Sequence, residues 1–98
     1  MTDFISFRSK KELRELAEFL AKLESRRLSD EYREIFRTGI AEKRKRIAVD
    51  RYRKGELSLG KASEIAGLSV WEMLELLKEQ RVELNLEVED IIQAAEEI

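Results

Sequence analysis

The stretch that decides the fold is 57-LSLGKASEIAGLSVWEMLELL-77, which has the form of two helices joined by a tight turn. Gly67 can adopt the left-handed conformation that ends a helix. Ser69, with Glu72 three residues later, is a capping box that starts the next helix. Small side chains let the two helices approach closely; these are Ala62, Ser63 and Ala66. The combination favours a helix-turn-helix over a plain helical hairpin.

The second of these helices is where a helix-turn-helix places its contacts to DNA bases, but its exposed side is acidic. Glu72, Glu75 and Glu79 would enter a groove lined with phosphates, with Lys78 beside them. This pattern favours a packing or protein-binding unit over a DNA-reading one. Trp71, early in the helix, is then a core or interface residue.

The C-terminal half of the chain resembles a family of small prokaryotic proteins. The similar residues are 47-IAVDRYRKGELSLGKA-62, 66-AGLSVWEM-73 and 81-RVELN-85. That family is predicted to consist of antitoxins with a helix-turn-helix, often encoded beside a PIN-type ribonuclease toxin. The resemblance implies a DNA-binding antitoxin, and a PIN-type toxin nuclease as its protein partner.

The first residues alternate in a way that predicts a short strand, with Ile5 and Phe7 on one face. Because so short a strand must pair with another, we expect it to pair with a second chain. Two helices follow, one starting at a capping box of Ser9 and Glu12, the other capped by Ser29. The first has a predicted buried stripe made of Leu13, Leu16, Ala17, Leu20 and Leu23.

This order of strand, helix, turn and helix in residues 2–42 resembles the ribbon-helix-helix family. The resemblance implies a dimer whose paired strands lie in the major groove of DNA. By position, Phe4, Ser6 and Arg8 would face the bases, and Ser29 would bind a phosphate. The dimer interface would consist of Ile5, Phe7, Ile35, Phe36 and Ile40. The alternative is a helical hairpin preceded by a short tail.

This 98-residue chain has a net charge of −2, which is the sum of a basic half and an acidic half. Residues 1–54 carry 16 Lys and Arg against 10 Asp and Glu, a net charge of +6. Residues 55–98 carry 3 against 11, a net charge of −8. A basic half suits a polyanion and an acidic half suits a basic partner. Alternatively, the two halves neutralise each other within an assembly.

Histidine and cysteine are both absent, which removes the usual general base, the commonest metal ligands and disulfides. We therefore expect no enzymatic activity, no metal site and no cofactor. No apolar run approaches the roughly 20 residues of a membrane helix, and no signal-peptide pattern is seen. The predicted location is the cytoplasm.

Four consecutive basic residues, Lys43 to Arg46, stand between the two halves. On a helix they would spread around most of the circumference, so they cannot share one surface. One interpretation is a solvated helical connector; the other is contact with the DNA backbone.

After a short extended segment, the chain ends in a predicted amphipathic helix with an acidic side. Its apolar stripe consists of Val88, Ile91, Ile92, Ala95 and Ile98. The residues predicted to bind a protein partner are Trp71, Val88, Ile91, Ile92 and Ile98. Packing of this helix on its own helix-turn-helix is the alternative.

The sequence therefore predicts a mostly α-helical protein in three parts. Residues 1–42 form a ribbon-helix-helix module, residues 43–54 a basic helical connector, and residues 55–98 an acidic helix-turn-helix module with a terminal amphipathic helix. The predicted function is that of a homodimeric antitoxin or repressor that binds operator DNA and holds a protein partner through its acidic half. A protein-interaction adaptor without DNA binding and an RNA-binding regulator are the alternatives.

Overall fold

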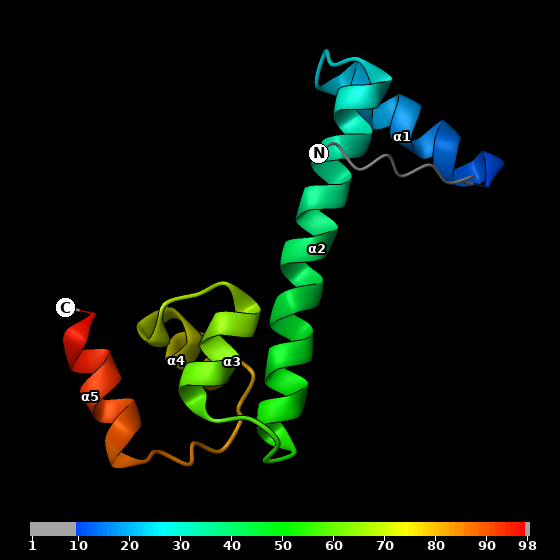
Figure 1. Cartoon of the computed structure of the whole chain (residues 1–98). Helices are drawn as coiled ribbons and strands as arrows, with labels where there is room; N and C mark the ends of the chain where they lie inside the picture. The colour runs from blue at the N-terminus through cyan, green and yellow to red at the C-terminus, as the bar shows by residue number, and fades with distance from the viewer. Residues whose placement is uncertain (1–9, 98) are drawn as a thin grey trace, which may run out of the picture. The chain divides into compact units, whose positions relative to one another are not determined.

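A computed structural model describes residues 10–97 of the chain, and these residues form five α-helices (Figure 1). The helices are α1 (Lys11–Leu23), α2 (Leu28–Arg53), α3 (Leu59–Ala66), α4 (Val70–Glu79) and α5 (Val88–Glu96). The chain divides into two compact units between Arg37 and Thr38, within α2.

The predicted ribbon-helix-helix class is wrong. Every regular element in residues 10–97 is a helix, and this range contains no strand. The segment predicted to be the strand, which holds Phe4, Ile5, Ser6, Phe7 and Arg8, lies outside the described residues. Helix α2 also continues unbroken for 26 residues, through the predicted module boundary at residue 42 and into the predicted helical connector. It does so because Ala, Glu, Lys and Arg are strong helix formers and no proline interrupts them.

The boundaries of the first two helices differ from those predicted. Helix α1 begins after Lys10, which makes no side-chain cap hydrogen bond, and Ser9 lies outside the described residues. Helix α2 begins at Leu28, so Ser29 lies in its first turn and is not its N-cap. The predicted part boundary at residue 42 falls inside α2, and the three-part division stays a prediction.

The first unit leaves its large apolar side chains exposed. In α1 the buried residues are the small Ala17 and Ala21, whereas Leu13, Leu16 and Leu23 are more than half exposed. The predicted burial of this stripe is therefore confirmed for Ala17 and wrong for its leucines. The predicted interface residues of α2 are exposed as well; they are Ile35, Phe36 and Ile40.

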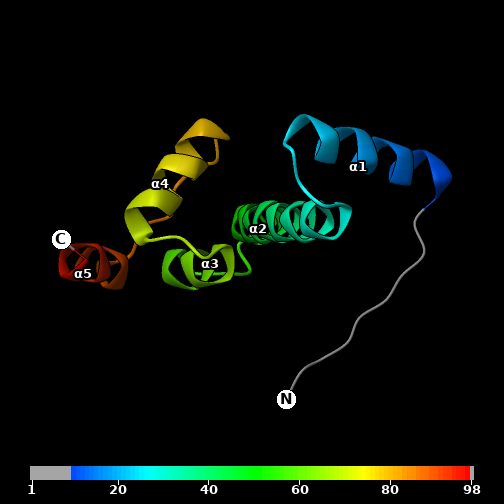
Figure 2. The same cartoon turned by 90° about the horizontal axis from the view of Figure 1, so that it is seen from above.

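The second unit has a core to which α2, α3, α4 and α5 all contribute; Figure 2 shows these helices from above. Its buried residues are Ala48, Val49, Tyr52, Leu59, Ala62, Ala66, Val70, Met73, Leu77, Val82 and Ala94. Helix α3 packs against α4, and both pack against α5. The largest fully buried side chains are Leu59, Met73 and Leu77, and burying each contributes about 1.5–3 kcal/mol.

The turn between α3 and α4 has the local structure that the sequence predicts. Gly67 has φ 73° and ψ 31°, which is the left-handed conformation. The Ser69 hydroxyl accepts from the Glu72 amide at 3.1 Å, and the Glu72 carboxylate accepts from the Ser69 amide at 3.0 Å. The predicted capping box is thus confirmed. Ser58 caps α3 by accepting from the Lys61 amide at 3.2 Å.

The capping box makes the stability of the protein depend on pH. The hydrogen bond from the Ser69 backbone, with a smaller effect of the Ser69 side chain, holds the pKa of Glu72 below its usual range. A lowered carboxyl pKa stabilises the fold above the unfolded-state pKa, which is about 4.3 for Glu, and this stabilisation is lost as pH falls through the folded-state value.

We expect Glu72→Gln to lower the melting temperature at pH 7 and to have a smaller effect at pH 3, because the ionised fraction of the wild-type carboxylate falls as the pH drops toward its lowered pKa. Circular dichroism melts at both pH values measure the difference. Glu79→Gln, on the same helix but outside the capping box, is the matched control. An equal effect of Glu72→Gln at pH 3 and pH 7 would contradict the prediction.

Candidate functional site

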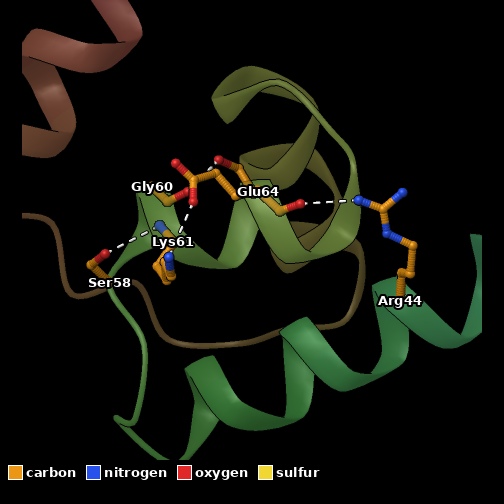
Figure 3. Close-up of polar contacts among 6 residues, drawn as sticks. Arg44, Ser58, Gly60, Lys61 and Glu64 are labelled. Atoms are coloured by element: carbon orange, nitrogen blue, oxygen red, sulfur yellow. Dashed lines mark hydrogen bonds and ion pairs between the residues drawn. The ribbon is translucent and has the colours of Figure 1, made fainter.

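Arg44, from the basic run, ties α2 to the end of α3 (Figure 3). Its Nε donates to the carbonyl oxygen of Ile65 at 2.8 Å, and its Nη2 donates to that of Glu64 at 3.1 Å. The last carbonyls of a helix have no partners within it and carry the negative end of the helix dipole, so a guanidinium is well suited to them. Arg44 therefore helps to fix α2 against the turn that follows α3.

Two separate features of this arrangement favour glycine at position 67. Its positive φ disfavours any residue with a side chain. A Cβ atom built on Gly67 would also lie 2.8 Å from Nη1 of Arg44, closer than real Cβ contacts. The glycine predicted from the turn thus makes room for a cation from another helix, a role that the local sequence does not reveal.

The basic run does not form one surface. Arg44 contacts α3, so the interpretation of the run as a solvated connector does not hold for it. Lys45 forms an ion pair with Glu42 at 3.6 Å and also lowers the pKa of Glu72. The two remaining cations, Lys43 and Arg46, are exposed.

Helical spacing places further cations on the side of α2 that carries Lys43 and Arg46. The buried Ala48 and Tyr52 mark the opposite side, which packs into the core. We call the exposed set the basic face of α2; it consists of Lys43, Arg46, Arg51 and Lys54. Asp50 lies among them and forms an ion pair with Arg53 at 3.8 Å. The face therefore keeps a positive net charge.

The outer face of α4 is acidic, as the sequence indicates, because Glu72, Glu75 and Glu79 are all exposed. Trp71 lies beside them and is 48% exposed. Its indole Nε1 donates to the carbonyl oxygen of Ala94 at 3.0 Å, so the ring joins α4 to α5. Trp71 is thus both a structural contact and a surface residue.

Helix α5 packs on its own unit, yet its apolar stripe remains exposed. The buried residues of α5 are Asp90 and Ala94, and the carboxylate of Glu97 accepts from the Val70 amide at 2.8 Å. The predicted partner-binding residues Val88, Ile91 and Ile92 are 69%, 61% and 53% exposed. Ile98 lies outside the described residues. Packing on the unit and an open apolar face, predicted as alternatives, occur together.

A groove of about 290 Å³ lies between α4 and α5. Its lining is almost entirely apolar and consists of Leu59, Trp71, Leu74, Leu86, Asp90, Ile91, Ala94 and Ala95. We call it the α4–α5 groove. A second hollow, of about 510 Å³, is polar and is lined by Tyr52, Arg53, Gly55, Glu56, Leu57, Ser58, Glu83, Leu84, Asn85, Glu87 and Asp90.

The predicted phosphate site at Ser29 has acidic neighbours. Ser29 is exposed in the first turn of α2, followed by Asp30 and Glu31. Glu31 is buried, and its Oε2 has no hydrogen-bond partner among residues 10–97. Asp30 forms ion pairs with Arg27 at 3.1 Å and with Arg33 at 3.5 Å, so cations as well as carboxylates surround Ser29. The base-reading residues predicted at Phe4, Ser6 and Arg8 lie outside the described range.

Metal-binding clusters and membrane-spanning helices are both absent from the described part of the chain. No group of three or more Asp or Glu side chains within it is placed to hold a metal ion. None of its helices is long and apolar enough to cross a membrane.

A protein-family model described as an uncharacterised protein family, UPF0175, matches residues 27–98. A UPF0175 protein of Archaeoglobus fulgidus is 47% identical over 45 residues, which cover 46% of this chain and 52% of the relative. A UPF0175 protein of Aeropyrum pernix is 43% identical over 76 residues, which cover 74% of this chain and 85% of the relative. The chain thus spans about half of the first relative and most of the second. No solved structure gives a significant match. With about three quarters of its length matched, the chain belongs to the uncharacterised family UPF0175.

Proposed function

We propose that the chain is a DNA-binding regulator of the antitoxin or repressor type, which dimerises through its first unit and holds a protein partner on its acidic second unit. The observation that supports both protein contacts is the pair of apolar helix faces, on α1 and on α5, that the chain itself leaves exposed. Exposed apolar surface of this kind marks protein interfaces. Two such faces, one on each unit, suit two different protein contacts.

The basic face of α2 supports contact with DNA. Lys43, Arg46, Arg51 and Lys54 are exposed cations on one side of a helix, which suits the phosphate backbone. The acidic outer face of α4 opposes entry of that helix into a groove. We therefore assign the DNA contact to α2. The resemblance to helix-turn-helix antitoxins supports the same class of function.

The α5 surface supports a separate protein contact. The carboxylates of α5 would repel DNA, so α5 takes no part in DNA binding. It can therefore bind a protein while α2 contacts the duplex. A toxin nuclease with a basic substrate-binding surface is a partner of the right chemistry, and the PIN-type partner implied by the resemblance falls in that class.

The salt dependence of DNA binding tests the assignment to α2. A dimer that places four cations per copy on phosphates should show a slope of log K against log salt of about −7. We expect the combined variant K43Q, R46Q, R51Q and K54Q to bring this slope close to zero and to weaken binding about 100-fold or more in 0.1 M salt. Fluorescence anisotropy with a labelled duplex from upstream of the gene measures both.

The control variant neutralises three exposed cations elsewhere in the second unit, Lys61, Lys78 and Arg81, and should leave the slope unchanged. Loss of binding in the control but not in the test variant would place the contact elsewhere. Tighter binding to single-stranded RNA of the same sequence would favour the RNA-binding alternative. Absence of binding to either nucleic acid would favour the adaptor.

A further inference from the structure

Helix α5 is docked with its apolar side facing outward. The side that packs carries Asp90, Ala94 and Glu97, at positions i, i+4 and i+7. The large apolar side chains Val88, Ile91 and Ile92 follow the opposite side and are more than half exposed. A terminal helix that only completed a core would present these side chains to it. The orientation of α5 therefore indicates a surface that something else covers.

The α4–α5 groove beside this stripe is already formed in the single chain. The hydrogen bond from Trp71 to Ala94 fixes the indole ring in one wall, and the contact of Glu97 with the Val70 amide holds the end of α5 near the start of α4. At about 290 Å³ the groove is smaller than most small-molecule sites and suits one or two anchoring side chains. Such pockets typically receive the hot-spot residues of a protein partner.

The charge around the groove restricts what can occupy it. Residues 86–97 contain five acidic residues and no Lys or Arg. On the other wall, α4 exposes Glu75 one turn from Trp71 and Lys78 one turn from Leu74, so the net charge around the groove stays negative. An apolar surface bordered by carboxylates attracts a segment that carries cations beside its apolar residues, and it repels an acidic one.

We propose that the α4–α5 groove, together with Val88, Ile91 and Ile92, binds a basic amphipathic helix of a partner protein. An apolar side chain of that helix enters the groove beside Trp71, and its Lys or Arg residues lie against Glu87 and Glu89. This inference rests on the proposed function, whose protein partner it specifies. A second copy is the less favoured occupant, because two such acidic faces brought together would repel each other.

The test uses the full-length protein and synthetic peptides as probes. Trp71 is the single tryptophan of the chain, so its fluorescence reports directly on the groove. We expect a 16-residue helical peptide of Leu and Lys to shift the Trp71 emission to the blue with saturable binding. A Leu/Glu peptide and a Ser/Lys peptide of equal length, which lack the charge or the apolar side chains, should give no such shift.

Variants of the protein test the surface itself. We expect Ile91→Ser to weaken binding of the Leu/Lys peptide about 10-fold or more. Leu84→Ser, an exposed apolar residue of the same unit that does not line the groove, should leave binding unchanged. The double variant E87Q and E89Q should weaken binding and reduce its dependence on salt. Far-UV circular dichroism checks that each variant keeps its helices.

Equal binding of the Leu/Glu peptide, or unchanged binding to Ile91→Ser, would overturn the proposal. Self-association without peptide that is lost in Ile91→Ser would make a second copy the occupant and would also overturn it. The DNA measurement separates this inference from the proposed function. Binding to DNA without binding to the Leu/Lys peptide would contradict this inference and leave the proposed DNA binding standing. Binding to the peptide without binding to DNA would contradict the assignment of the DNA contact and leave this inference standing.

Discussion

Replacing both Leu16 and Phe36 with serine is expected to convert the protein from a dimer to a monomer at micromolar concentration. The two side chains are 58% and 55% exposed in the single chain, and both lie in the first unit. A two-fold interface uses each residue twice, so the variant removes four apolar side chains from the dimer. Because about half of each side chain is already covered, each loss costs about 1 kcal/mol. The dissociation constant should therefore rise about 1,000-fold.

Sedimentation equilibrium over a range of concentrations measures this change. Ile91→Ser, which alters an equally exposed apolar residue of the second unit, is the control and should leave the dimer intact. A wild-type protein that is a folded monomer at micromolar concentration would contradict the proposed dimer. A double variant that remains dimeric would place the interface on other residues.

The turn between α3 and α4 could be predicted from the sequence because its determinants are local. The left-handed glycine at Gly67 and the capping box of Ser69 and Glu72 depend on residues within three or four positions of each other. The cap of α3 is equally local, because Ser58 accepts from an amide three residues later. Such contacts form whenever the two helices form, whatever surrounds them.

The burial of the apolar stripes could not be predicted in the same way. Periodicity shows that Leu13, Leu16 and Leu23 share a face, but not whether the same chain covers that face. The orientation of α5 depends on hydrogen bonds between residues 23 and 27 positions apart in the sequence, from Trp71 to Ala94 and from Val70 to Glu97. No local pattern specifies these partners.

The ribbon-helix-helix interpretation failed because it relied on the order of short elements. Helix α2 runs through Gly39 to Arg53, so the predicted second helix and the predicted helical connector of residues 43–54 form one continuous helix. A single glycine costs a helix only about 1 kcal/mol, which the strong helix formers around it offset. The contact of Arg44 with α3 could not be predicted from the sequence either. Four adjacent cations look alike in the sequence, and only the packed structure shows which of them contacts α3.

The substitution Gly67→Ala is expected to lower the melting temperature by about 10–20 °C. A residue with a side chain in the left-handed conformation costs about 1–2 kcal/mol. The new methyl group would also displace the Arg44 guanidinium, whose nearest atom lies 2.8 Å from the Cβ position. Losing the two hydrogen bonds of this exposed side chain adds about 1 kcal/mol. A total of about 2–3 kcal/mol gives the stated shift for a chain of this size.

Gly39→Ala is the matched control. Gly39 lies within α2, and apart from the neighbouring backbone of that helix no atom of the described residues lies within 4 Å of the position of its Cβ. Alanine is favoured over glycine in a helix by about 0.5–1 kcal/mol, so the control should melt at the same or a higher temperature than wild type. Equal effects of the two substitutions would contradict the left-handed conformation at Gly67.

A double-mutant cycle separates the two costs at Gly67. In an Arg44→Ala background the guanidinium is absent, so Gly67→Ala should cost only its backbone strain, and the two substitutions should be less than additive by about 1 kcal/mol. Gly67→Asn gives a second comparison, because Asn tolerates the left-handed conformation but still carries a Cβ atom. In the wild-type background it should retain the conflict with Arg44 while relieving most of the strain. Strict additivity of Arg44→Ala and Gly67→Ala would show that α2 is not fixed to the turn through this contact.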